Sequence, residues 1–92
     1  MPLVFSMKPG QDFYVGDDRV VVGTIYGKTR FDVVVEKTGH THSISEEEAV
    51  EIITDVFVSS GPRPVAGIAK VAIDAPQEVL ILRGDRYRES AP

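Results

Sequence analysis

Residues 19–37, which read RVVVGTIYGKTRFDVVVEK, decide the fold of this chain. β-branched residues fill both halves of the stretch, and Gly27 stands at the first central position of a two-residue turn. After the turn, Phe31, Val33 and Val35 alternate with mostly polar neighbours, which is typical of a half-buried strand. The stretch therefore predicts a β-hairpin within a mostly-β fold.

Further short strands are predicted on both sides of this hairpin, because apolar and β-branched runs alternate there with glycine and proline turns. These strands cover residues 3–8, 12–15, 66–74 and 78–83. Residues 38–43 are predicted to form a loop. The polar residues 84–92 are expected to form a turn or a short helix.

One helix is predicted from its own signals, over residues 45–57. Ser45 and Glu48 have the spacing of a capping box, and the acidic residues between them suit the positive end of a helix dipole. An apolar stripe at helical spacing is formed by Ala49, Val50 and Ile53. A strand is the alternative for residues 55–59, because Val-Phe-Val favours one.

Composition limits the class of protein. The chain has 92 residues, 42% of them hydrophobic and 26% charged, which is typical of one small globular domain. It contains no cysteine, which excludes disulfides, thiol nucleophiles and cysteine-ligated metal sites. No apolar run approaches the about 20 residues of a membrane span and no signal peptide is evident, so we expect a cytoplasmic protein.

The net charge of −4 is unevenly distributed. Residues 36–62 hold one lysine against five glutamates and one aspartate, whereas the two flanks are close to neutral. An anion-binding surface would therefore have to be built from the two ends of the chain.

The last predicted strand is apolar on both faces, because residues 79–82 read Val-Leu-Ile-Leu. A chain this short has little other material with which to cover both faces. A second copy is the simplest cover, so we expect a homodimer.

The two ends of the chain together resemble the carbon storage regulator family (CsrA/RsmA). The resemblance lies in LVFSMKPGQ at residues 3–11, VGDD at 15–18 and AKVAIDAPQEVLILR at 69–83. It implies a single domain over residues 1–92, with an insertion that lies within about residues 19–65. The implied fold is a small intertwined β-sheet homodimer, in which the first strand of one subunit lies beside the last strand of the other.

The resemblance also implies a function: a post-transcriptional regulator that binds GGA motifs in single-stranded loops of mRNA leaders or of small regulatory RNAs. Its implied RNA-binding residues are Val4, Phe5, Ser6, Lys8, Lys70, Ala75, Pro76, Gln77 and Arg83. Its implied dimer interface contains Leu3, Val79, Leu80, Ile81 and Leu82. The family's first basic position is occupied here by Met7, and its apolar RNA-facing position by Phe5.

Each implied role has a plainer alternative. Arg83 would stack on a base and contact phosphates, or would simply end a strand at the solvated rim. Lys8 would contact a phosphate, or would protect an edge strand from aggregation. Phe5 would stack on a base or pack into the core of the dimer. The turn at residues 75–77 would read base edges through its backbone, or would serve only as a turn.

Other chemistry has weaker support. His40 and His42 would share one face of a strand and could hold a metal ion, but their spacing suggests no third ligand. Helix capping accounts for the glutamates at 46–48 and 51 without catalysis. Because no phosphate loop or nucleophile–base pair is evident, we expect neither an enzyme nor a cofactor.

A second hypothesis belongs to another class. The chain would keep the family's scaffold, would have lost RNA binding, and would act as a protein-interaction module through the acidic 45–57 helix. The position of the acidic segment discriminates the two hypotheses, because glutamates packed over the RNA surface would repel phosphates.

Overall fold

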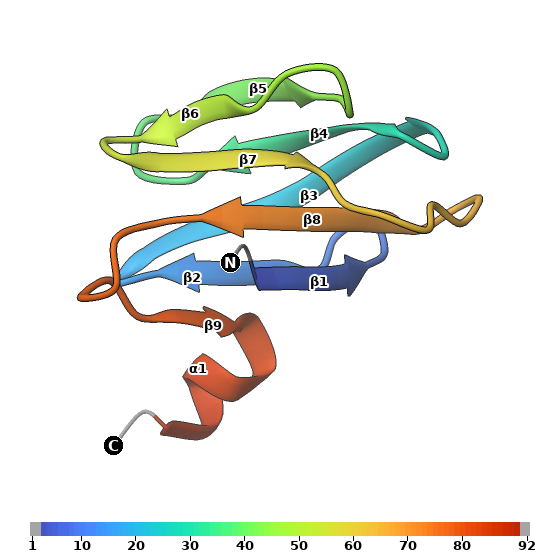
Figure 1. Cartoon of the computed structure of the whole chain (residues 1–92). Helices are drawn as coiled ribbons and strands as arrows, with labels where there is room; N and C mark the ends of the chain where they lie inside the picture. The colour runs from blue at the N-terminus through green and yellow to red at the C-terminus, as the bar shows by residue number, and fades with distance from the viewer. Residues whose placement is uncertain (1–2, 91–92) are drawn as a thin grey trace.

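The structure is a computed structural model that describes residues 3–90, and these residues form nine strands and one helix (Figure 1). The first five strands are β1 (Leu3–Met7), β2 (Asp12–Val15), β3 (Asp18–Gly27), β4 (Arg30–Val35) and β5 (His40–Ile44). The other elements are β6 (Val50–Ile53), β7 (Val56–Ser60), β8 (Ala69–Asp74), β9 (Ile81–Arg83) and α1 (Gly84–Ser90). The mostly-β prediction is confirmed. The predicted single domain spans residues 1–92, whose first two and last two residues lie outside the described part.

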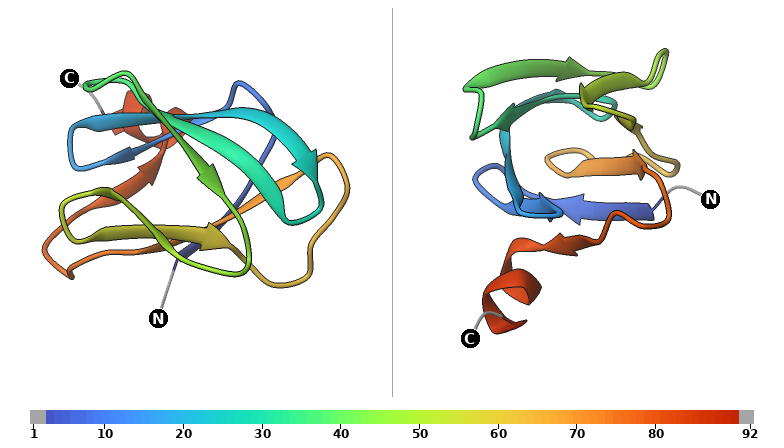
Figure 2. Two further views of the ribbon diagram at one scale, coloured as in Figure 1. Left: turned by 90° about the horizontal axis from the view of Figure 1, so that it is seen from above. Right: turned by 90° about the vertical axis from the view of Figure 1, so that its left-hand side faces the viewer.

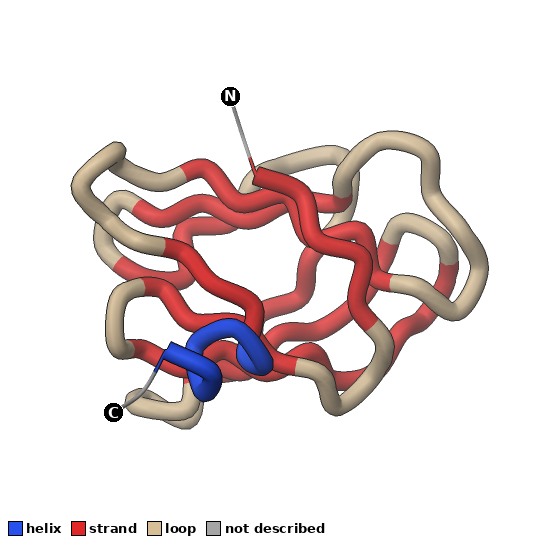
Figure 3. Tube along the Cα trace, turned by 90° about the horizontal axis from the view of Figure 1, so that it is seen from below, coloured by secondary structure: helices blue, strands red, loops and turns tan. Residues whose placement is uncertain are grey.

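The strands form two antiparallel sheets that face each other across the interior (Figure 2). One sheet has the order β1-β8-β7-β6 and the other the order β5-β4-β3-β2-β9. Seen from below, the strands surround the interior and α1 lies outside them (Figure 3). β1 and β9 therefore form the edges of the two sheets at the same end of the molecule (Figure 1).

The core consists of side chains that point inward from both sheets at every second residue. The predicted hairpin is β3 and β4, and its Phe31, Val33 and Val35 are buried as the alternation requires. The tight turn lies one residue later than predicted, at Lys28 and Thr29, because Gly27 still pairs with Arg30. The largest fully buried side chains are Phe13, Phe31, Met7, Ile44, Ile73, Val20, Val22, Val33, Val35, Val56, Val58 and Val71.

The prediction of a helix over residues 45–57 is wrong. The segment contains an irregular link, the strand β6, a turn at Thr54 and Asp55, and the strand β7. Ile52, Val56 and Val58 are buried on the core face, whereas Ala49 is exposed. A capping box stabilises a helix by only about 1 kcal/mol. Pairing of β7 with β8 and burial of three β-branched side chains outweigh that local preference. The alternative of a strand over residues 55–59 is the correct one.

Two other segments test the sequence predictions. The loop predicted over residues 38–43 is wrong in its second half, because His40–Ile44 forms β5, which pairs with β4. The last strand is shorter than predicted: residues 77–79 turn, and only Ile81–Arg83 is extended. The polar C-terminal segment forms the short helix α1, as one of its two expected forms.

Candidate functional site

Two sheet edges that are far apart in sequence meet at one end of the molecule. β1 ends one sheet and β9 ends the other, and the described residues place no strand on the outer side of either. A shallow groove of about 230 Å³ lies between them and the loop after β8. We call this region the seam; its residues are Leu3, Phe5, Ile73, Ala75, Pro76, Gln77, Val79, Ile81 and Arg83.

Arg83 is the most constrained cation of the seam. It pairs in register with Phe13, which is fully buried, so its side chain leaves the backbone on the core side of β9. Its guanidinium carbon lies 5.8 Å from the ring centroid of Phe5. The Phe5 ring in turn lies 6.1 Å from that of Phe13, at 60°. Of the alternatives for Phe5, the described structure favours packing against the core.

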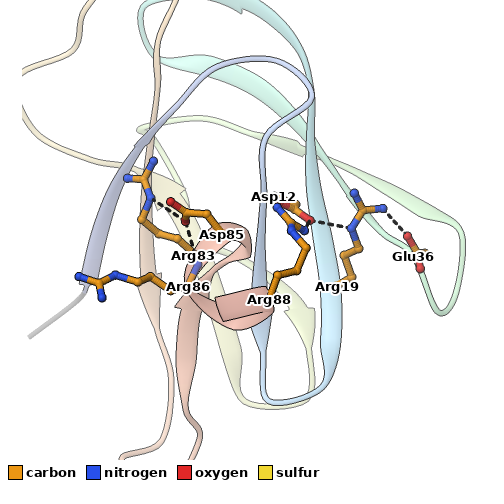
Figure 4. Close-up of polar contacts among 7 residues, drawn as sticks. All are labelled: Asp12, Arg19, Glu36, Arg83, Asp85, Arg86 and Arg88. Carbon is orange, nitrogen blue, oxygen red and sulfur yellow. Dashed lines mark hydrogen bonds and ion pairs between the residues drawn. The ribbon is translucent and has the colours of Figure 1, made fainter. Parts of the chain in front are cut away.

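A carboxylate and a second arginine accompany Arg83. The Nε atom of Arg83 lies 3.8 Å from a carboxylate oxygen of Asp85. Arg86 extends from α1 on the same side as Arg83 (Figure 4). The sequence predictions did not include Arg86, although its spacing of three residues from Arg83 at a helix start is a signal for a shared face.

The predicted RNA-binding residues lie in two regions, the seam and the outer face of the first sheet. Phe5, Ala75, Pro76, Gln77 and Arg83 lie at the seam. Of the other four, Val4, Ser6 and Lys70 lie on the outer face of the first sheet, where Val4 is opposite Ala72 and Ser6 is opposite Lys70. Lys8 follows the end of β1. The Lys70 ammonium group donates a hydrogen bond of 3.0 Å to the Ser6 hydroxyl. The structure thus brings five of the nine residues together in one place.

Residues 7 and 8, which occupy the two basic positions of the family that the chain resembles, differ in exposure. Lys8 follows β1 and is exposed, and its ammonium group has no ion pair among residues 3–90. Met7 is fully buried in the core. An arginine at position 7 of this chain would therefore bury an unpaired charge.

The predicted dimer residues are unevenly covered by the chain itself. Val79 and Ile81 pack against the core, and Leu82 is half-buried. Leu3 and Leu80 remain 43% and 64% exposed. Most of the apolar side chains of the last predicted strand are therefore covered by the chain itself, and a second copy is not needed to bury them.

An ionic network centred on the buried Asp12 holds α1 on the second sheet (Figure 4). Asp12 is only 6% exposed. Its carboxylate accepts a hydrogen bond of 2.7 Å from Arg19 and bonds of 2.9 and 3.3 Å from Arg88. Arg19 also donates a bond of 2.6 Å to Glu36. The network joins β2, β3 and α1.

This network shifts the pKa values of its members. The hydrogen bonds from Arg88 lower the pKa of Asp12, burial opposes that shift, and Arg19 adds to it. The Asp12 carboxylate raises the pKa of both arginines. The three groups are therefore held in their charged forms.

Aromatic stacking and a missing side chain complete the attachment of α1. The ring of Tyr87 stacks on that of Tyr14 at 3.6 Å, and the Tyr87 hydroxyl donates a hydrogen bond to Asp17. A Cβ atom at Gly84 would collide with the Asp12 carboxylate. A glycine at the start of a helix is the local sequence signal that fits such a close approach.

Another hollow lies elsewhere, between β3 and the loops that contain residues 9–10 and 66–67. It has a volume of about 880 Å³, and Lys28 is the one charged residue that lines it. Its lining residues are Pro9, Gly10, Val22, Gly23, Thr24, Ile25, Tyr26, Gly27, Lys28, Ala66 and Gly67. No predicted site residue is among them.

The candidate metal ligands lie on β5. His40 and His42 share one face of the strand, with ring centroids 6.3 Å apart. Within residues 3–90, no third histidine or carboxylate joins them in a group that could hold a metal ion. α1, the one helix of that part of the chain, is too short to cross a membrane.

Comparison with protein-family models, with curated proteins and with solved structures found no match for this chain.

Proposed function

We propose that the protein is an RNA-binding post-transcriptional regulator that recognises GGA motifs in single-stranded loops. The observation that carries the proposal is the position of Arg83, which lies over Phe5 at an open seam between two sheet edges. A guanidinium plane at such a site is suited to stack on an unpaired base. Ala75, Pro76 and Gln77, which lead into the turn at residues 77–79, are part of the same seam and would supply backbone groups to base edges.

The position of the acidic segment supports RNA binding over its loss. Glu46, Glu47 and Glu48 are exposed in the link between β5 and β6. Because β5 and β6 are the sheet edges opposite to β9 and β1, this link lies at the far end of the molecule from the seam (Figure 1). Its glutamates would repel phosphates bound at the seam only weakly, because salt screens repulsion between charges more than about 10 Å apart.

A homodimer is part of the proposal. Leu3 and Leu80 are exposed apolar side chains close to β1 and β9, and both strands have an open edge among the described residues. An open strand edge can pair with another chain. Since one chain already encloses a core, the proposed dimer joins two folded chains.

The proposal is tested with a GGA-containing RNA hairpin and a hairpin of scrambled loop sequence, at two salt concentrations. We expect a preference for GGA and an affinity that falls with salt, because phosphate contacts release counterions. Arg83→Ala should weaken GGA binding by about 1–3 kcal/mol without lowering Tm. Equal binding of the two hairpins at low salt would overturn the proposal.

The alternative is a scaffold without RNA binding that acts as a protein-interaction module. The helix that this alternative expected over residues 45–57 does not form. The contact surface of the module would therefore be the exposed acidic link at residues 45–49 together with β6. The exposure of Glu46, Glu47 and Glu48 favours a basic partner. Charge reversal of these three residues should leave RNA binding intact if the first proposal is right, and should abolish partner binding if the alternative is right.

A further inference from the structure

Arg83 is held on two sides by neighbours from different parts of the chain. The guanidinium carbon lies over the ring of Phe5, from β1, at 5.8 Å from the ring centroid. Asp85, from α1, lies 3.8 Å from Nε at the guanidinium edge. The Arg83 side chain is still 39% exposed, so part of it remains accessible.

This arrangement excludes one role for Phe5 and suggests another. With Arg83 on its ring and Phe13 beside it, Phe5 cannot also offer that face to a base without displacing the guanidinium. A cation over an aromatic ring is attracted by the ring's negative face and is restricted in orientation. Restricting a long side chain before binding reduces the entropy that binding would otherwise cost.

We propose that Phe5 is a positioning residue that holds the Arg83 guanidinium flat, so that its other face stacks on a purine base of single-stranded RNA. The inference rests on the proposed RNA-binding function and specifies how its central residue acts. Arg83 contacts RNA through its face, because the Asp85 carboxylate lies 3.8 Å from Nε and its negative charge would repel a phosphate at that edge. The order along the site is then Phe5, Arg83 and base, with Phe13 tilted at 60° beside Phe5.

A direct measurement tests the contact without RNA. Protons near the face of an aromatic ring are shifted upfield, so the side-chain protons of Arg83 should show this shift in the NMR spectrum of the wild-type protein. Phe5→Leu should remove it, whereas Phe57→Leu should not. Phe57 is the matched control because it is partly exposed on β7, outside the seam.

RNA binding then tests the positioning role. Phe5→Leu should weaken binding to the GGA hairpin about threefold to tenfold, and Phe5→Tyr should restore most of it. In the Arg83→Ala background, Phe5→Leu should have no further effect, because its contribution passes through Arg83. The slope of affinity against salt should stay unchanged in Phe5→Leu, since no phosphate contact is lost.

The variant Arg83→Lys distinguishes the contribution of the planar guanidinium face from that of the positive charge. Lysine keeps the positive charge but has no planar group to stack. We expect it to bind the hairpin nearly as weakly as Arg83→Ala.

The outcomes separate the inference from the function on which it rests. A wild-type protein that does not prefer GGA overturns both. A protein that prefers GGA but tolerates Phe5→Leu as well as Phe57→Leu, or whose Arg83 protons show no upfield shift, overturns only the positioning role of Phe5.

Discussion

Gly84 and Asp12 show how single residues determine the attachment of the C-terminal helix. Gly84 starts α1 directly above the buried Asp12 carboxylate, which Arg19 and Arg88 hold in place. The carboxylate cannot move aside without losing hydrogen bonds to both arginines. The missing side chain at position 84 is therefore a packing requirement.

Gly84→Ala should destabilise the protein by about 1–3 kcal/mol, because the new methyl group overlaps the Asp12 carboxylate. Urea unfolding monitored by circular dichroism measures this free energy. Gly27→Ala is the matched control, since a Cβ atom there meets nothing within 4 Å. Equal stability of the two variants would show that α1 is not held against Asp12.

Asp12 should make stability dependent on acid pH. Its pKa is lowered in the folded state, so its contribution is fully present above its ordinary value of 3.8 and is lost as pH falls through the folded value. The unfolding free energy of wild type should therefore exceed that of Asp12→Asn most at neutral pH. Below about pH 4 the difference should shrink. Denaturant titrations between pH 2 and pH 7 measure it, and a difference that is constant with pH would contradict the network.

Among the elements, the hairpin of β6 and β7 departs furthest from the local sequence signals. Its turn places Asp55 at a φ of +63°, a left-handed conformation that strains most side chains. The backbone N–H of Asp55 donates a hydrogen bond to the Glu51 side chain. A helix would place the same residue at negative φ, so substitutions at position 55 distinguish the two structures.

In the hairpin, Asp55→Val should lower the free energy of unfolding by about 1–2 kcal/mol, because a β-branched residue tolerates positive φ poorly. Asp55→Gly should preserve stability or raise it slightly, since glycine adopts this conformation freely. A helical segment would reverse the order, because glycine costs about 1 kcal/mol inside a helix. Thermal unfolding of the two variants side by side decides between them.

At the scale of the whole molecule, one chain closes its own core. The segment between residues 28 and 60 supplies β4, β5, β6 and β7, which join the strands of the two chain ends into two facing sheets. The first and last strands therefore meet within one chain, where the family resemblance implies partner subunits. Folding need not depend on a second copy.

We expect the proposed homodimer to dissociate on dilution into folded monomers. Leu80→Lys should shift the equilibrium to monomer without lowering Tm, because it adds charge to an exposed apolar position close to β9. Tyr26→Lys is the control, since Tyr26 is also 64% exposed but lies at the far end of β3. Light scattering across a concentration series measures the association. A wild-type protein that stays monomeric at high micromolar concentration would remove the dimer from the proposal.

The sequence alone predicted the features that depend on neighbouring residues. The β3–β4 hairpin follows from the alternation of Phe31, Val33 and Val35, and the strands at both ends follow from their β-branched runs and their turns. The candidate site was predicted in part: five of its nine residues lie at the seam, and Arg83 and Phe5 are in contact.

The tertiary structure alone decided what depends on contacts between distant segments. Residues 45–57 carry good local helix signals, but burial of Ile52, Val56 and Val58 in a sheet stabilises them by more than a helix cap can. Met7 is buried because β1 pairs with β8 in a register that turns it inward, and one residue of slip would have exposed it. The ionic network of Asp12, Arg19 and Arg88 joins residues up to 76 positions apart, so no local pattern could indicate it. Each local preference contributes only about 1 kcal/mol. Burial of the core, which forms only when the whole chain is assembled, contributes more and therefore outweighs these preferences here.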